Sequence, residues 1–478
     1  MNCACDEDSY APNVDQAIAS PRESGMVSSP SDDGGVSRWR ARSNAKPIRD
    51  VQLQNLRHDL TFRVTGAASI ARLEPLLLGD NWEGPKVSWS PAKIDGGSTD
   101  VIDLVWETTV SKKDREKHRK AVVLNRLSGA QVLEDKASLA LLQHLMTAPT
   151  LKSHVVKGGA AVTLWARLQF QQDLPLHGSA GRTPDGDVPL AAPQTGEAAA
   201  PAQDSKGNAG EDNWWCVKAA GGNGGMDVWV LHEGNWTSVT EKLHHNEEYV
   251  IQRYVARPML WRGRKFHFRC YVVVTADMSA WLYRKAYILC ASVPYCRETN
   301  GGVGGAQSGL TNELMHISNL AVNKHTKDHP GQVPCDVPSE YPALWPRMLA
   351  VCKSLVEAAS PFMRHQAALG HFEFLGLDII ADEAGGVWLM EANRLPGLQS
   401  SKQNLEEENE MYDDMMLDVI RLVVLPPLLG CPPDPGLFEV ATEASTDSRA
   451  PSTETWRNVI RFAAFKRSCK CRPPSSSA

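Results

Sequence analysis

Hydrophobic and polar residues alternate over residues 265–274 in the pattern that is typical of a β-strand. The alternation predicts one face that packs on a core and an opposite face that carries charged groups. A turn at 276–279 would pair Tyr271 with Arg284 on the next strand and add Arg284 to the charged face. The apolar face would contain Phe266, Phe268, Cys270, Val272 and Val274, and the polar face Lys265, His267, Arg269 and Tyr271.

A second hairpin is predicted over residues 376–393, where two strands flank a turn at 383–386. A four-residue turn pairs Asp382 with Val387 and sets the register of the remaining pairs. One face of this hairpin would be wholly apolar, so we expect it to pack on a core. That face would contain Leu377, Ile379, Ala381, Trp388, Met390 and Ala392.

The opposite face of that hairpin carries oxygen donors. In the expected register Asp378 lies directly opposite Glu391, and Asn393 projects from the same face. Two facing carboxylates repel each other unless a cation or a proton lies between them. Such donors suit Mg²⁺, which proteins typically hold with one or two carboxylates plus substrate phosphates. A solvated edge hairpin is the alternative, and the apolar reverse face disfavours it.

A glycine-rich stretch follows Lys218, between two apolar, strand-like runs within residues 214–231. Glycines allow backbone N–H groups to approach phosphate oxygens, and a lysine adds a positive charge to the same anion. The stretch is not a Walker A loop, because Gly225 is followed by Met226 and Asp227 rather than by Lys and Ser or Thr. A plain glycine-rich hairpin is the alternative interpretation.

Composition and charge exclude several classes of protein. The chain has 478 residues, 22% charged and 42% hydrophobic, and a formal charge of -6, which argues against a general nucleic-acid binder. No apolar run approaches the roughly 18–20 residues that span a bilayer, and eleven scattered cysteines indicate a reducing, cytosolic compartment. Residues 251–290 depart from this balance with eight Lys or Arg and one acid, so we expect them to bind an anion.

Composition also divides the chain. Segments rich in Ser, Asp, Pro and Gly without apolar periodicity cannot offset the entropy of ordering, which predicts disorder. We expect a disordered segment over 1–50, an N-terminal domain over 51–150, a central segment over 151–212 with a low-complexity insertion at 176–212, a strand-rich domain over 213–430, and a disordered tail over 431–478.

From residue 62 to residue 425 the order of these features resembles the tubulin tyrosine ligase family of the ATP-grasp superfamily. The resemblance implies an α/β (α+β) fold, with a smaller N-terminal α/β domain and an ATP-grasp catalytic domain over 213–430. It rests on seven segments in register: NRLSGAQVLEDKASL (125–139), VKAAGGNGG (217–225), YVIQRYVARPML (249–260), RKFHFRCYVVV (264–274), WLYRKAYIL (281–289), HISNLAVNK (316–324) and the FLGLDII…WLMEAN hairpin.

The resemblance also implies roles for individual residues. The cofactor-binding residues would be Lys136, Lys218, Gly221, Gly222, Gly224, Gly225, Gln252, Arg253, Tyr254, Lys265 and Asp378. The residues that act on the transferred phosphate and the acceptor would be Lys265, Arg269, Arg284 and Glu391, and the magnesium ligands would be Asp378, Glu391 and Asn393. Substrate would contact His316, Ser318 and Asn319.

The implied reaction is ATP-driven amide formation with ATP and Mg²⁺ as cofactors. A substrate carboxylate forms an acylphosphate, and the amine of a free amino acid displaces phosphate. The implied acceptor is the acidic C-terminal tail of tubulin, and the implied enzyme is a monomer in the cytoplasm, associated with microtubules or cilia. Neither nucleic acid nor membrane is an expected partner.

Two other functions stay open at this point: ligation of a small-molecule carboxylate, and non-catalytic, nucleotide-dependent binding of tubulin. The non-catalytic alternative is favoured by two departures from the family pattern, because His267 replaces an acidic residue and Cys290 replaces an arginine. The retained Asp378, Glu391 and Asn393 disfavour it. The family's His-x-Thr-Asn segment is present as 316–319, with a serine in place of the threonine.

Overall fold

The structure is a computed structural model that describes residues 59–79, 87–92, 101–107, 121–170, 213–221, 227–296, 313–327, 329–363, 370–394, 396–400 and 405–443. The predicted disordered segment 1–50 and the insertion 176–212 lie outside these residues. Residues 431–443, expected to open a disordered tail, are described and contain strand β16 (Phe438–Thr442). Among the described helices, none combines the length and the apolar character that crossing a membrane requires.

Twelve strands of the described chain form one large mixed sheet, whose main path runs β13-β12-β10-β14-β4-β3-β1-β2. The N-terminal strands join this sheet through β4, which pairs in parallel with β14, so the predicted N-terminal domain shares a sheet with the strand-rich domain. The strands are β1 (Asp59–Val64), β2 (Ser88–Pro91), β3 (Leu104–Trp106), β4 (Val123–Leu124), β9 (Leu260–Trp261), β10 (Arg264–Thr275), β11 (Ala280–Tyr283), β12 (Lys285–Cys290), β13 (Gln332–Asp336), β14 (Gly370–Ala381), β15 (Val387–Arg394) and β16.

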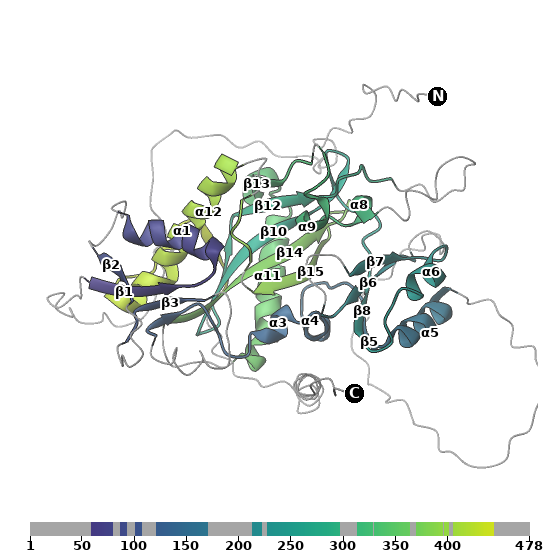
Figure 1. Cartoon of the computed structure of the whole chain (residues 1–478), viewed down its shortest axis with the longest axis horizontal. Helices are drawn as coiled ribbons and strands as arrows, with labels where there is room; N and C mark the ends of the chain where they lie inside the picture. Colours follow the sequence, from purple (N-terminus) through teal and green to yellow (C-terminus); the bar gives the residue numbers. More distant parts are fainter. Residues whose placement is uncertain are drawn as a thin grey trace, which may run out of the picture. The chain divides into compact units, whose positions relative to one another are not determined.

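A second sheet has four strands in the order β5-β8-β6-β7. These strands are β5 (Ser153–Lys157), β6 (Trp215–Ala219), β7 (Val228–Leu231) and β8 (Glu248–Arg253). Helices α5 (Gly159–Phe170) and α6 (Trp236–Thr240) pack on one face of it, on the side away from the large sheet (Figure 1). The central segment therefore contributes a strand and a helix to this small sheet.

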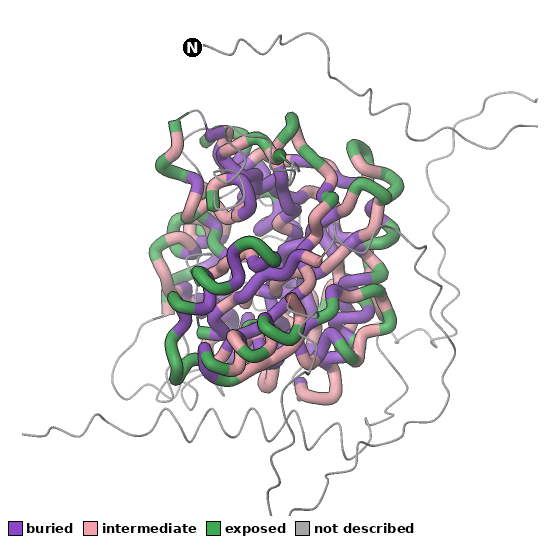
Figure 2. The backbone as a smooth tube through the Cα atoms, turned by 90° about the vertical axis from the view of Figure 1, so that its right-hand side faces the viewer, coloured by how far each residue is buried: buried purple, intermediate pink, exposed green. Residues whose placement is uncertain are grey.

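Two hydrophobic cores flank the large sheet, and Figure 2 shows that buried residues gather in the interior of the described chain. The first core lies under α11 (Trp345–Ala359), with α3 (Gln131–Glu134) and α4 (Lys136–Gln143) beside it. The second lies under α1 (Ala67–Leu78), α12 (Leu405–Val419), the π-helix η5 (Ile420–Val424) and α13 (Leu425–Leu429). The remaining short helices are α8 (Glu313–His316), α9 (Leu320–Asn323), α10 (Val337–Glu340) and η4 (Ser360–Phe362).

The period-2 pattern of β10 is confirmed, because its predicted apolar residues all lie in the first core. The predicted pairing of its hairpin is wrong by one residue. Val272 pairs with Leu282, and the connecting turn is one residue longer than expected. Arg284 consequently follows β11 rather than facing Tyr271, and its Nη1 lies 3.9 Å from Oε2 of Glu439, which is on β16.

Candidate functional site

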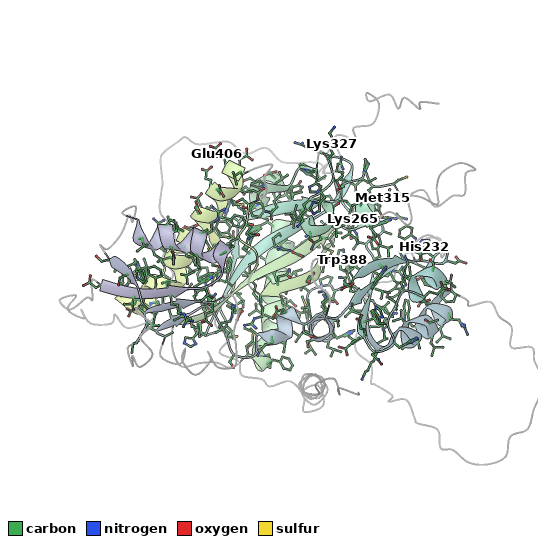
Figure 3. All side chains as sticks on the ribbon, in the orientation of Figure 1. His232, Lys265, Met315, Lys327, Trp388 and Glu406 are labelled. Atoms are coloured by element: carbon green, nitrogen blue, oxygen red, sulfur yellow. The ribbon has the colours of Figure 1, made fainter. Side chains whose placement is uncertain are left out.

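A cavity of ≈ 110 Å³ lies between the two sheets. Strands β6, β7 and β8 line one side, and β10, β14 and β15 line the other. Figure 3 shows Lys265 of β10 and Trp388 of β15 in this region. Eleven residues predicted for the site line the cavity: Lys136, Lys218, Gln252, Arg253, Tyr254, Lys265, His316, Ser318, Asn319, Asp378 and Glu391.

The β14–β15 hairpin places Asp378 opposite Glu391, as the sequence predicts, but the register of the pairs near the turn differs from the prediction. Near the turn Ala381 pairs with Val387, which is one residue out of the expected register. A β-bulge at Met390 then adds one residue to β15 and restores the pairing of Asp378 with Glu391. Two offsets of one residue therefore cancel at the position of the two carboxylates.

The bulge changes which side chains of β15 face the core. Val387 and Leu389 are buried in the first core. Met390 lines the cavity, and Nε1 of Trp388 donates a hydrogen bond to the Asp382 carboxylate at 3.0 Å. The prediction that Trp388 and Met390 pack on the core is therefore wrong. It is confirmed for Leu377, Ile379, Ala381 and Ala392.

Asp378 is almost fully buried and is held by a guanidinium group. Both carboxylate oxygens of Asp378 accept hydrogen bonds from Arg269, one from Nε and the other from Nη2 at 3.0 Å. Burial alone would raise the pKa of Asp378, but the charge and the hydrogen bonds of Arg269 outweigh burial and lower it. Asp378 is consequently ionised at neutral pH. Nδ2 of Asn393 lies 3.5 Å from the Asp378 carboxylate. Neither Asn393, predicted as a magnesium ligand, nor Arg269, predicted to act on the phosphate, lines the cavity.

Glu391 has a different cationic partner. Its Oε1 lies 3.1 Å from Nζ of Lys136, the first residue of α4. Asp135 caps this helix by accepting a hydrogen bond from the backbone N–H of Ser138 at 2.8 Å, which sets the direction in which α4 begins. Each of the two facing carboxylates thus has its own positive partner, and these ion pairs offset their mutual repulsion.

Lys265 is buried on the face of β10 that also carries Arg269, with 6% of its surface exposed. Its Nζ lies 4.0 Å from the centroid of the Tyr254 ring, within the range of a cation–π contact. Burial lowers the pKa of Lys265 to about 7, and the charge of Lys218 lowers it in the same direction. The Tyr254 hydroxyl forms a hydrogen bond of 2.9 Å with Nδ1 of His316, which links the end of β8 to the 316–319 segment.

His267, the departure from the family pattern, also faces the cavity. Its Nδ1 forms a hydrogen bond of 2.7 Å with the hydroxyl of Ser318. Burial lowers the pKa of His267 to about 4 against the opposing effect of Asp378, so the imidazole is neutral at pH 7. Asn319 has a local role as well, because its Oδ1 accepts the N–H of Ala321 at 2.8 Å and caps α9.

The structure does not bring every predicted residue to the cavity. Arg284 lies beside Glu439, and Gly221 is exposed and does not line the cavity. Cys290 is buried in the first core, paired with Phe266, so a substrate contact at that position is not supported. Gly222, Gly224 and Gly225 lie outside the described residues.

The apolar residues that line the cavity were not predicted from the sequence. Leu151, Val228, Ile380 and Met390 line it together with the charged residues. A signal for Ile380 was present, because a residue two positions after Asp378 on a strand shares its face. Leu151 lies just before β5, and its position in the cavity wall depends on how the two sheets pack.

The donor set at the hairpin fits a divalent cation that is also bound by phosphates. Within the described ranges, no three His, Cys, Asp or Glu side chains form a metal cluster. Asp378 and Glu391 together supply two carboxylates at the cavity wall, the number with which Mg²⁺ is typically held beside substrate phosphates. These residues therefore suit a phosphate-bound Mg²⁺ better than an ion held by protein ligands alone.

Two sheets that enclose a cavity lined by lysines and carboxylates form the architecture of an ATP-grasp fold. The C-terminal domain of K. lactis Pby1, described as an ATP-grasp enzyme interacting with the mRNA decapping enzyme Dcp2, matches this structure with a TM-score of 0.51. The match covers 81% of this chain and 99% of that chain at 16% sequence identity. At this level of identity the likeness concerns the fold alone.

Residues 192–429 match the sequence model of the Tubulin-tyrosine ligase family, and the chain is a TTL-like member of the ATP-grasp proteins. It is 26% identical to Tubulin polyglutamylase TTLL5 of Homo sapiens over 296 residues, which is 55% of this chain and 20% of that protein. It is 26% identical to the Probable tubulin polyglutamylase ttll-9 of Caenorhabditis elegans over 227 residues, 44% of this chain and 52% of that protein. For Tubulin monoglutamylase TTLL4 of Mus musculus the identity is 23% over 231 residues, 42% of this chain and 18% of that protein. The chain thus spans between about a fifth and about half of the length of these relatives.

Proposed function

We propose that this chain is an ATP-dependent ligase that joins an amino acid to a carboxylate on an acidic protein tail, with tubulin as the acceptor. One observation carries the proposal: three lysines and the two carboxylates of the β14–β15 hairpin, from separate strands and a helix, meet in one cavity between two sheets. The family match and the names of the relatives, which are tubulin polyglutamylases and a monoglutamylase, support it. We further infer a monomer that acts in the cytoplasm, on microtubules or in cilia.

The base and the phosphates of ATP would occupy different ends of the cavity. Leu151, Val228 and Ile380 offer apolar surface to adenine, beside the backbone of residues 252–254. Lys136 and Lys218 would bind the phosphates, since ammonium groups form strong, charge-assisted hydrogen bonds with phosphate oxygens. The 316–319 segment would contact the amino acid or the acceptor.

In the proposed reaction an oxygen of the acceptor carboxylate attacks the γ-phosphorus, the bond to the β-phosphate oxygen breaks, and ADP leaves. The amine of the amino acid then attacks the acyl carbon, phosphate leaves, and the nitrogen loses a proton. Lys265 would stabilise the charge that develops on the transferred phosphoryl group, and Arg269 would hold the Asp378 carboxylate in place. Mg²⁺, held by Asp378 and Glu391, would neutralise further phosphate charge.

The test is transfer of labelled amino acids to tubulin. The purified chain is incubated with tubulin, Mg-ATP and a panel of labelled amino acids, next to Glu391→Gln and to Glu406→Gln, an exposed acid on α12 that serves as the matched control. We expect transfer by the wild type and by Glu406→Gln, and a loss of at least about 100-fold in Glu391→Gln, since a magnesium ligand is lost. No transfer above the Glu391→Gln background would overturn the proposal.

A second candidate function is nucleotide-dependent binding of tubulin without catalysis. It is favoured by His267, because a neutral imidazole stands beside Asp378, with 3.8 Å between Nε2 and Oδ2, at a position where the family pattern has an acid. Co-sedimentation with microtubules that depends on ATP but yields no ADP would support this function. ADP formation from a small carboxylate without tubulin would instead indicate a small-molecule ligase.

A further inference from the structure

The β-bulge at Met390 decides on which face of the sheet Glu391 lies. If the pairing of Ile379 with Leu389 continued without a bulge, Glu391 would pair with Leu377. Leu377 is fully buried in the first core, so Glu391 would then point into that core, away from Asp378. The juxtaposition of the two carboxylates therefore depends on the bulge.

Hydrogen bonds from outside the hairpin hold the two carbonyl groups of the bulge. Nε2 of Gln143, the last residue of α4, donates to the carbonyl oxygen of Leu389 at 3.0 Å. Nζ of Lys218 lies 3.4 Å from the carbonyl oxygen of Met390. A bulge removes ladder partners from the strand, and these two donors supply replacements.

The two donors belong to one chain of hydrogen bonds whose direction is fixed by its ends. Lys218 can only donate, so the oxygen of the Gln252 amide must face it, at 2.8 Å. The Gln252 nitrogen then donates to Gln143 Oε1 at 3.3 Å and to Ser153 at 3.2 Å. The carbonyl of Leu389 can only accept, so the Gln143 nitrogen must face the bulge. Both amides are thereby oriented without ambiguity.

Burial makes this contact difficult to replace. Gln143 is 3% exposed, and Leu389 is 1% exposed. Water has little access to the carbonyl group of Leu389, so a lost donor would leave a buried acceptor unpaired. Helix α4 contacts the hairpin at both of its ends, because Lys136 at its start pairs with the Glu391 carboxylate.

We propose that Gln143 is a positioning residue, which holds the Met390 bulge through the Leu389 carbonyl and thereby keeps Glu391 beside Asp378 at the cavity. The proposal deepens the proposed function and rests on it where ATP and Mg²⁺ are concerned. The placement of Glu391 itself can be measured without either ligand.

The first measurement uses Gln143→Glu, which keeps an acceptor for Gln252 and loses the donor to Leu389. The matched control is Ser153→Ala, which alters the same network and leaves the contact with Leu389 intact. We expect Gln143→Glu to weaken binding of Mg-ATP about tenfold, as for other residues that orient metal ligands, and to change binding of ATP in EDTA less than twofold. If Gln143→Glu does not fold, Gln143→Met is measured in the same way.

The second measurement is a double-mutant cycle with Glu391→Gln. If Gln143 acts through Glu391, Gln143→Glu weakens Mg-ATP binding no further in the Glu391→Gln background. Equal losses in both backgrounds would overturn the proposal, as would equal losses with and without Mg²⁺.

The third measurement, lysine acylation read by mass spectrometry in the absence of nucleotide, separates this proposal from the proposed function. Gln143→Glu should raise the labelling of Lys136 as much as Glu391→Gln does, and Ser153→Ala should not. A wild type that binds no ATP would refute the proposed function, whereas unchanged labelling of Lys136 in Gln143→Glu would refute the positioning role.

Discussion

Replacement of the buried Lys265 by methionine should stabilise the fold near neutral pH and flatten its dependence on pH. Burial lowers the pKa of Lys265 from 10.5 to about 7. Among the described residues no carboxylate forms a salt bridge with it, and its ammonium group lies against the Tyr254 ring. Methionine keeps the length of the side chain and removes the charge.

The magnitude follows from the two pKa values. Below pH 7 the native state must hold a buried ammonium group, a cost of about 5 kcal/mol at 1.36 kcal/mol per pH unit. Between pH 7 and 10.5 the unfolded state binds more protons than the native state, so this cost shrinks as pH rises. From pH 7, where Lys265 is half protonated, to pH 9, the change amounts to about 2 kcal/mol.

Urea unfolding at pH 7 and pH 9 measures this change. The stability advantage of Lys265→Met over the wild type should be about 2 kcal/mol smaller at pH 9 than at pH 7. Lys242→Met, which removes an exposed lysine, corrects for the loss of one positive charge. Parallel pH profiles for wild type and Lys265→Met would refute the reasoning, because they would mean that Lys265 stays protonated throughout.

Two other predictions concern the frame around the site. Glu373→Gln should destabilise the fold by about 3–5 kcal/mol in urea unfolding, because it removes the buried carboxylate that pairs with the guanidinium groups of Arg126 and Arg394; an unchanged midpoint would contradict this. Gly129→Ala should cost at least about 2 kcal/mol and lower the melting temperature, since Gly129 has φ +93° and a Cβ there would overlap the carbonyl oxygen of Phe362. A melting temperature equal to that of the wild type would count against the second prediction.

Local patterns in the sequence predict the strand faces well. The alternation in β10 correctly separates its core residues from Lys265, His267 and Arg269, because side chains on a strand must alternate between its two faces. The strand faces depend only on neighbouring residues. The pairing of Asp378 with Glu391 agrees with the prediction only because the offset at the turn and the bulge cancel.

Features that depend on turn geometry or on distant packing were not predictable in the same way. One additional residue in the turn before β11 is enough to remove Arg284 from the expected face, and composition does not reveal the length of that turn. The ion pair of Lys136 with Glu391 joins residues that are far apart in the sequence, so it depends on where α4 packs. Facing carboxylates indicate that a cation is needed, but not that Arg269 and Lys136 provide separate partners.

The bulge shows why a correct pairing can rest on an incorrect register. In β15 the core residues are Val387 and Leu389 and then Ala392, so the apolar period changes phase across Met390. Such a change of phase is the sequence signal of a bulge. Here Met390 conceals it, because it is apolar and yet lines the cavity. A polar residue at position 390 would have shown the change of phase in the sequence. The bulge itself would still need donors from outside the hairpin, which Gln143 and Lys218 provide.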